Sequence, residues 1–335
     1  MRFGLFGGAT VKGSDAGDSS RDYKEFIDYV VEAEALGFHS VFLVEHHFTG
    51  FNQVSASLSL LAYLAAVTKR MRLGTAVTVL PWHNPVLVAE QAATVDLLSN
   101  GRLDFGIGRG YRYSEFHGFC TPMEEAQERY DEALEVIRKA WTSTGRFSHH
   151  GKRWHYDDIV VEPSPTQKPH PPFWIGAGTA PVLDIAGRIG LNVLLDQLAT
   201  PEVTGERVAV YRKAVEAAGR AFDPMSIGVT RSLCMAMNDR ERAAQIEARG
   251  IFLDNVRRLT VNPKGSGGSL AVPSSPEEGR RATERCALLG PPDEIIRRLQ
   301  HLQSLGVEYV LVMDFGVSMD MLRMFAREVM PAFAT

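Results

Sequence analysis

Three features of this sequence predict an α/β fold built around a parallel sheet. Apolar, β-branched or aromatic runs alternate with amphipathic stretches along most of the 335 residues. Eight such units can be counted, which is the number that closes a barrel. The first apolar run is followed by Phe6-Gly7-Gly8-Ala9-Thr10 rather than by a GxGxxG turn, so an open doubly wound sheet is the less favoured alternative. We therefore predict a single domain over residues 1–335, an eight-stranded parallel TIM-type barrel.

The expected strands are short runs of residues that favour extended backbone. In chain order they cover 2–6, 40–44, 72–79, 103–107, 172–177, 192–197, 226–235 and 309–315. The spacing of apolar residues predicts helices between them, over 22–36, 54–67, 85–98, 124–141, 201–218 and 292–305. In such a barrel the functional residues lie at the carboxyl ends of the strands.

Two segments interrupt the alternation. Residues 145–172 are rich in His, Pro and aromatic residues, and we expect them to form an insertion before the fifth strand. Residues 262–279 consist largely of Gly, Ser and Pro, which favour irregular backbone. A loop of this length inside a compact domain is typical of a lid, and we predict a lid over the barrel mouth. The alternative is a passive surface insertion.

Composition argues against several classes of protein. The net charge of -4 and the pI near 6.2 give no electrostatic footprint for nucleic acid, and the basic residues are too scattered for a membrane-binding patch. No apolar run approaches the roughly 18 residues of a membrane helix. Cys120, Cys234 and Cys286 are odd in number and far apart, which indicates neither a disulfide framework nor a zinc site. We expect a soluble, cytoplasmic protein without a metal, a nucleic-acid partner or a membrane partner.

The segment Glu45-His46-His47-Phe48 directly follows the second expected strand. Neighbouring residues on a strand point to opposite faces, so only one of the two histidines can enter the barrel mouth. A single histidine at a strand end provides an acid or base near neutral pH. The pair lacks the i, i+2 spacing of metal-binding histidines in hydrolase barrels. On its own, the pair is better explained by packed or surface histidines.

Two further strand ends suggest an anion site. Arg109 follows the fourth strand and precedes Gly110; glycine lets backbone approach a ligand, and the forked guanidinium suits phosphate. After the fifth strand, Gly178 and Thr179 lead into a helix, whose first amides and threonine hydroxyl could hold phosphate oxygens. Each feature is also explained by an ordinary turn or helix cap. The small residues of 74–79 leave room for a flat group against the backbone.

These motifs together resemble the bacterial luciferase family of flavin-dependent monooxygenases, and particularly the luciferase catalytic subunit. The similarity runs through EHHFTGF (45–51), LGTAVTVLP (73–81) and GRLDFGIGRG (101–110), and more weakly through FWIGAGTA (173–180) and VMPAF (329–333). The segments span nearly the whole chain, and their order and spacing argue against coincidence.

The resemblance implies a barrel that takes reduced FMN from a separate flavin reductase. Dioxygen would add to the flavin ring, and the resulting peroxide would oxygenate a small organic substrate. His46 matches the catalytic acid or base, Arg109 a phosphate-binding arginine, and Ala76-Val77 a non-prolyl cis peptide that supports the flavin ring. The cofactor-binding residues implied in this way are Glu45, Ala76, Val77, Arg109, Gly110, Gly178 and Thr179.

Three positions depart from the luciferase pattern. Gly108 stands where luciferase has a reactive cysteine, and we expect it to open space near the flavin ring. Gln127 stands near the place of a second phosphate-binding arginine, so either Arg129 substitutes or the phosphate is held more weakly. Gly178 replaces an acidic residue beside the phosphate hydroxyl. Light emission and substrate contacts are therefore not implied.

The helices expected at 54–67 and 85–98 are apolar or small on several faces. The luciferase family dimerises through these helices, with a buried glutamate that Glu90 resembles in position, and we predict a homodimer. The alternative is burial of these faces against the barrel.

Two other functions remain open. One is a deazaflavin-dependent oxidoreductase of the same superfamily, which transfers hydride without oxygen. The other is a non-catalytic flavin-binding protein, although the presence of both His46 and Arg109 argues against it.

Overall fold

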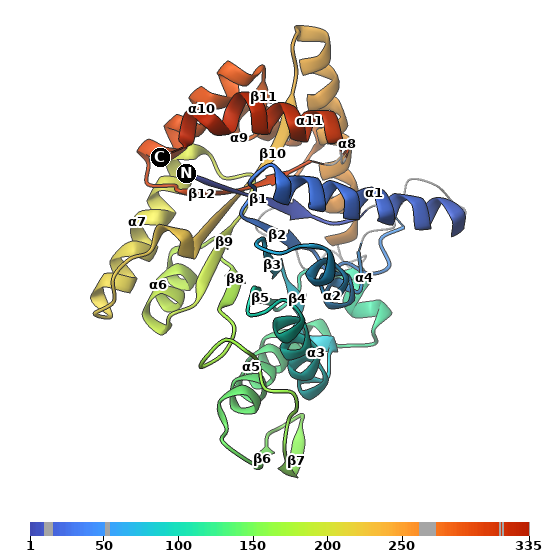
Figure 1. Ribbon diagram of the computed structural model, residues 1–335, viewed down its shortest axis with the longest axis vertical. Helices are drawn as coiled ribbons and strands as arrows, with labels where there is room; N and C mark the ends of the chain where they lie inside the picture. Colours follow the sequence, from blue (N-terminus) through green and yellow to red (C-terminus); the bar gives the residue numbers. More distant parts are fainter. Residues whose placement is uncertain (10–15, 51–53, 261–272, 315, 317, 335) are drawn as a thin grey trace.

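The computed structural model describes residues 1–9, 16–50, 54–260, 273–314, 316 and 318–334, and shows a closed parallel barrel (Figure 1). Its strands, in ring order, are β1 (Arg2–Gly7), β2 (Ser40–Leu43), β3 (Arg72–Thr75), β5 (Leu103–Gly108), β8 (Phe173–Gly176), β9 (Asn192–Leu195), β10 (Ile227–Met235) and β12 (Tyr309–Met313). Pairing of β12 with β1 closes the ring. The predicted eight-stranded barrel is confirmed, and apart from the third strand the predicted bounds lie within two residues of those observed.

The third strand differs from the prediction of one continuous strand over 72–79. β3 ends at Thr75, a cis peptide joins Ala76 to Val77, and the short strand β4 (Thr78–Val79) pairs with β5. The cis peptide implied by the luciferase resemblance is confirmed. It lies at the carboxyl end of β3, where the mouth of the barrel is.

Helices surround the sheet (Figure 1). They are α1 (Ala16–Ala35), α2 (Ser57–Val67), α3 (Pro85–Leu98), α4 (Tyr113–Gly118), α5 (Ala126–Thr142), α6 (Ala180–Ile189), α7 (Pro201–Ala217), α8 (Asp239–Thr260), α9 (Pro276–Cys286), α10 (Pro292–Ser304) and α11 (Met319–Met324). Short turns of 3-10 helix cover Leu80–Trp82, Met123–Glu125, Pro224–Ser226 and Met330–Phe333, and a π-helical turn covers Phe325–Val329. Among the described residues, no helix is long and apolar enough to cross a membrane.

Local chemistry explains where several helices begin. Asn84 caps α3 because its Oδ1 accepts the amides of Val86 and Leu87, and Pro85 occupies the first helical position, where no amide hydrogen is needed. α7 begins in the same way after Thr200. These signals are local, and the predicted bounds of both helices agree with the structure to within one residue.

Two apolar layers hold the barrel together. The interior is filled by large side chains from different strands of the ring, including Phe42, Trp174 and Leu311. Gly74 makes room for the ring of Phe42, which a Cβ at position 74 would overlap. The second layer lies between the strands and the helices and is the larger of the two. Burial of this apolar surface is the main stabilising contribution to such a fold.

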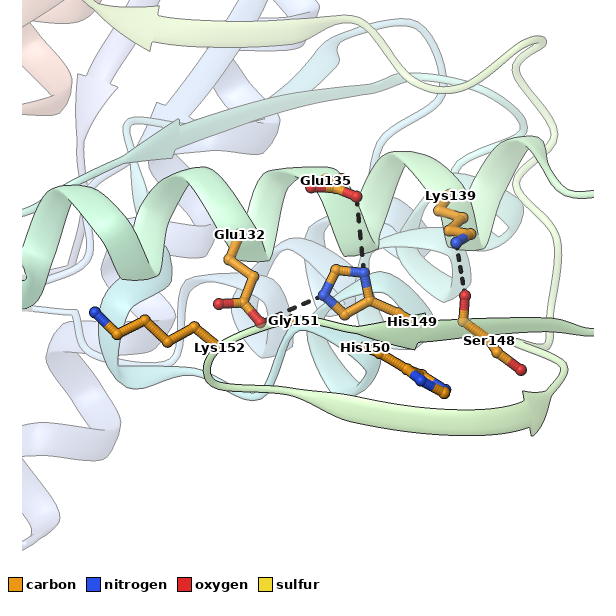
Figure 2. A pocket seen from close by; sticks show the side chains of 8 residues that line it. All are labelled: Glu132, Glu135, Lys139, Ser148, His149, His150, Gly151 and Lys152. Atoms are coloured by element: carbon orange, nitrogen blue, oxygen red, sulfur yellow. Dashed lines mark hydrogen bonds and ion pairs between the residues drawn. The ribbon is translucent and has the colours of Figure 1, made fainter.

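The predicted insertion before the fifth strand is a β-hairpin. β6 (Phe147–His150) and β7 (His155–Ile159) pair antiparallel and lie outside the barrel beside α5 (Figure 1). A cavity of about 510 Å³ lies between the hairpin and α5 (Figure 2). His149 lines it, with Nε2 3.3 Å from Oε1 of Glu132. The hairpin is thus attached to α5 by polar contacts.

The prediction of irregular backbone over 262–279 is wrong for the last residues of this segment. α9 begins at Pro276, because the Ser275 hydroxyl accepts the amide of Glu278 and proline is tolerated at the first helical position. Ser275 and Pro276 therefore begin a helix and do not continue the loop. Residues 262–272 lie outside the described residues, so the lid stays a prediction.

α8 connects two distant parts of the ring. It follows β10, and near its end the carbonyl of Leu259 accepts the hydroxyl of Ser114 on α4 at 3.4 Å. Since α4 follows β5, which β8 and β9 separate from β10 in the ring, α8 links the carboxyl-end segments of two strands that are not neighbours.

Candidate functional site

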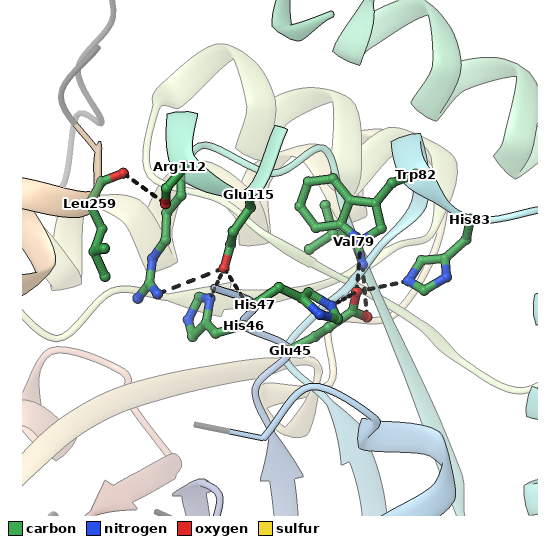
Figure 3. A network of polar contacts seen from close by, with 10 residues as sticks. Glu45, His46, His47, Val79, Trp82, His83, Arg112, Glu115 and Leu259 are labelled. Carbon is green, nitrogen blue, oxygen red and sulfur yellow. Dashed lines mark hydrogen bonds and ion pairs between the residues drawn. The ribbon is translucent and has the colours of Figure 1, made fainter. Parts of the chain in front are cut away.

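His46 is held in place from two sides. It lies three residues beyond β2, and its backbone amide donates to the carbonyl of Val54. Its Nδ1 lies 3.0 Å from Oε1 of Glu115 on α4, and the same oxygen accepts the backbone amide of His47 at 2.9 Å (Figure 3). An ionised Glu115 places the ring hydrogen on Nδ1, which leaves Nε2 as the atom that can take up or release a proton.

The environment of His46 keeps the ring neutral at pH 7. Burial lowers the pKa of His46 below its ordinary 6.5, and the hydrogen bond with Glu115 acts in the opposite direction. The guanidinium of Arg112, whose Nη1 lies 3.8 Å from the Glu115 carboxylate, also lowers the pKa of His46. A neutral, partly buried histidine is suited to accept a proton.

Glu45 serves as the centre of a second polar network (Figure 3). Its Oε1 accepts His83 Nε2 at 2.7 Å, Trp82 Nε1 at 3.0 Å and His47 Nε2 at 3.1 Å. Its Oε2 accepts the amide of Val79. Burial by itself would raise the pKa of Glu45, but the hydrogen bonds from His47 and His83 outweigh burial and hold the pKa at about 2. Glu45 therefore joins β2 to β4 through an ionised carboxylate, and its contact with a cofactor stays a prediction.

The two adjacent histidines thus have different partners. His47 turns to Glu45 and packs against aromatic rings, with its ring centroid 4.7 Å from that of Phe119 and 6.0 Å from that of Trp82. His46 turns to Glu115. The structure separates them as expected for neighbouring side chains, although β2 has already ended at Leu43.

Arg109 lies one residue beyond β5 and is exposed. Within the described part of the chain its guanidinium makes no hydrogen bond and no ion pair. Gly110 has φ +80, a left-handed conformation that favours glycine, and a Cβ there would lie 2.8 Å from Val79 Cγ1. The turn therefore presents a cation at the mouth that is available to an anionic ligand.

The turn over residues 176–179 leaves open space beside the start of α6. A Cβ at Gly176 would meet nothing within 4 Å, and neither Gly176 nor Gly178 has a left-handed φ. Thr179 occupies the cap position of α6, is exposed, and makes no side-chain capping bond. Thr179 and the start of α6 thus border open space, and the first amides there belong to Ala180 and Val182, because Pro181 has none. This arrangement is chemically suited to phosphate oxygens.

The space expected beside Gly108 is not open. A Cβ at Gly108 would overlap Cγ2 of Val77, whose side chain follows the cis peptide and occupies this position. The expectation that Gly108 opens room near a flavin ring is therefore wrong. Glycine at 108 accommodates Val77 instead.

Three functional candidates were missed by sequence reasoning. Glu115 lies on the six-residue helix α4, where its only sequence signal is a carboxylate beside apolar Phe116. Asp196 and Arg207 form an ion pair next to Gly178, and the signal for Asp196 is a charge directly after the β9 strand.

Neither side chain expected on α5 is free to take the role of the second phosphate arginine. Arg129 is held by Glu125, with both Nε and Nη2 at 2.9 Å from Oε2. Gln127 donates to Asp131. The structure therefore does not support the substitution of Arg129 for the missing arginine.

Comparison with known proteins identifies relatives along the whole chain. The oxygenase component of the flavin-dependent trigonelline monooxygenase of Acinetobacter baylyi is 29% identical over 100% of this chain and 96% of its own. The FMNH2-dependent dimethylsulfone monooxygenase of Pseudomonas putida is 27% identical over 84% of this chain and 79% of its own. The crystal structure of monooxygenase RslO1 from Streptomyces bottropensis superposes with a TM-score of 0.82, at 27% identity, and covers 100% of both chains.

The family model described as luciferase-like monooxygenase matches residues 1–309, which include every strand end of the site described above. The strand ends carrying His46, the Ala76-Val77 cis peptide, Arg109 and Thr179 all lie within that match. The chain belongs to the luciferase-like monooxygenase family.

Proposed function

We propose that this protein is the oxygenase component of a two-component monooxygenase, which uses reduced FMN and dioxygen to oxygenate a small organic substrate. The reduced FMN would come from a separate flavin reductase. One observation carries the proposal: strand ends of a single barrel bring a partly buried histidine paired with a carboxylate together with an open helix start and an arginine that has no partner among the described residues. The two relatives named for FMNH2 or flavin dependence support the choice of cofactor.

The residues present fit the phosphate end of FMN. The space over Gly176 and Gly178 is a cradle that a Cβ would narrow, and the first amides of α6 border it. Arg109 would supply a forked cation, and Thr179 a hydroxyl donor. Ala76-Val77 would lie against the ring system, because these two residues directly follow β3 at its carboxyl end, beside the mouth.

Reduced FMN, when bound, supplies the electrons that activate dioxygen. His46 would hold or move a proton at Nε2 near the reacting atoms, while Glu115 keeps the ring oriented through Nδ1. Partial cover of the carboxyl ends by α8 would help to exclude water from this region. The side chains thus provide position, proton control and a dry setting.

The test compares reduced cofactors with the full chain under anaerobic conditions. We expect reduced FMN to bind at micromolar or tighter affinity, and a reduced deazaflavin to bind at least tenfold more weakly. On admission of oxygen, the bound flavin should return to its oxidised absorbance at a rate different from that of free reduced FMN, with consumption of dioxygen. Preference for the deazaflavin, without oxygen consumption, would establish the hydride-transfer alternative. Flavin binding without any effect on the oxygen reaction would indicate a flavin-binding protein.

A homodimer also forms part of the proposal. Large apolar side chains are exposed on the adjacent helices α2 and α3, namely Tyr63 (55%), Leu87 (55%), Leu97 (41%) and Leu98 (55%). Glu90 on α3 is only half-buried within one chain. Exposed large apolar side chains on neighbouring helices are typical of a protein interface, and a second copy would cover them.

A further inference from the structure

A second guanidinium lies beside the 176–179 turn. Arg207 projects from α7, and its Nη1 lies 2.5 Å from Oδ2 of Asp196, one residue beyond β9. The other oxygen of Asp196 accepts the amides of Leu198 at 2.9 Å and Ala199 at 3.0 Å. The turn after β9 therefore fixes Asp196, and Asp196 fixes Arg207.

The free end of this guanidinium faces Gly178. A Cβ at Gly178 would lie 3.7 Å from Arg207 Nη2, and in the described part of the chain Nη2 makes no hydrogen bond. Gly178 does not have a left-handed φ, so the backbone does not require glycine here. What glycine provides is access, because a longer side chain at 178 would stand between Nη2 and the open space of the turn.

The two candidates on α5 have partners of their own, and no contact with the 176–179 turn is recorded for them. Arg129 is bound by Glu125, and Gln127 is neutral and bound to Asp131. Asp196 offsets the charge of Arg207, so the pair as a whole is neutral. Arg207 would therefore strengthen the binding of an anion through a fixed, charge-assisted hydrogen bond rather than through net positive charge.

We propose that Arg207 is a further cofactor-binding residue, whose Nη2 donates to the phosphate of FMN held at the 176–179 turn. The inference rests on the proposed function. A charge-assisted hydrogen bond of this kind is worth about ten- to hundredfold in affinity. The ribityl chain and ring system gain nothing from it, so the effect should be confined to ligands that carry the phosphate.

Riboflavin, which lacks the phosphate, provides the discriminating probe. Reduced FMN and reduced riboflavin are titrated anaerobically by calorimetry into the wild-type chain and into Arg207→Met. Gly178→Leu is included because it retains Arg207 and covers Nη2. Arg212→Met is the matched control, since Arg212 lies on the same helix but stacks on Phe222, with its guanidinium carbon 4.5 Å from the ring centroid.

The expected result is a tenfold or greater loss of FMN affinity in Arg207→Met and in Gly178→Leu, with riboflavin affinity within twofold of wild type. Arg212→Met should change neither affinity. If Arg109→Met removes the preference for FMN over riboflavin but Arg207→Met and Gly178→Leu do not, the role of Arg207 is overturned and the proposed function stands. If the wild type itself does not distinguish FMN from riboflavin, the phosphate site and the inference fall together.

Discussion

Nδ1 of His46 and Oε1 of Glu115 lie 3.0 Å apart, although 69 residues separate them in the chain. The barrel brings the segment after β2 and the helix after β5 to the same end, where a base and its orienting carboxylate meet. This contact leaves Nε2 as the atom available for chemistry.

Replacement of Glu115 by Gln should lower the pKa of His46 further. Burial already lowers the pKa of His46, whereas Glu115 raises it by favouring the charged ring. Without the charge of Glu115, the effect of burial on this pKa is therefore larger. A nuclear magnetic resonance titration of the histidine ring should therefore show its midpoint at lower pH. Glu132→Gln, which alters the separate contact with His149, is the control. A midpoint that stays in place or rises would contradict the assigned role.

Replacement of His46 by Ala should reduce turnover far more than FMN affinity. The proposed role of His46 is proton transfer near the reacting centre, which typically contributes a factor of about 10² to 10⁴ to the rate. Steady-state turnover and anaerobic binding of reduced FMN are measured on the same preparation. Equal losses in rate and affinity would show that His46 acts in binding instead.

Replacement of Glu45 by Gln should destabilise the fold near neutral pH. The folded-state pKa of about 2 lies below the ordinary 4.5, so the ionised form contributes stability above about pH 4.5, and this contribution is lost as the pH falls towards 2. The difference corresponds to about 3 kcal/mol. Urea denaturation should show a loss of roughly that size at pH 7 and a smaller one at pH 3. Glu135→Gln, with a side chain 69% exposed, should have little effect at either pH.

Replacement of Gly108 by Ala should destabilise the fold by about 1–3 kcal/mol, because the new methyl group overlaps Cγ2 of Val77. Val77→Ala removes that atom and leaves its Cβ as the nearest Val77 atom, 3.3 Å from the position 108 Cβ. The loss of unfolding free energy in the double variant should therefore be clearly smaller than the sum of the losses in the two single variants. Free energies of unfolding from urea titrations give the coupling, and additive effects would refute the contact.

Replacement of Leu87 by Glu should dissociate the proposed homodimer. A charge at a site that is 55% exposed in one chain costs little in the monomer but is unfavourable when a second copy covers it. Light scattering coupled to size exclusion should show a dimer for the wild type and a monomer for the variant. Ile185→Glu on α6, at a site 57% exposed, is the matched control and should remain dimeric. A monomeric wild type would exclude the dimer.

Much of the fold could be predicted because its signals are local. Alternating apolar runs and amphipathic stretches located the strands, and the start of α3 at Pro85 follows from its neighbour Asn84. The break after Thr75 could not be read from hydrophobicity, since a peptide bond's isomer leaves no trace in the apolar pattern. Serine and proline are typical of loops, but they are also typical of the first positions of a helix, as Ser275 and Pro276 are here.

The candidate site could be predicted only at its strand ends. His46 and Arg109 each follow an apolar run directly, which is why the sequence singles them out. Glu115 lies on a helix too short to show a period, and its partner is far away in the chain. Arg207 lies within an amphipathic helix, where a charged residue is typical of a solvent-facing position. Only the closed ring places these two side chains beside the strand ends.

The contact between Val77 and Gly108 also makes the sizes of the residues at these two positions interdependent. A larger residue at 108 would be selected against while valine occupies 77, whereas a smaller residue at 77 is tolerated first. Folded variants with a larger residue at 108 should therefore carry a residue smaller than valine at 77.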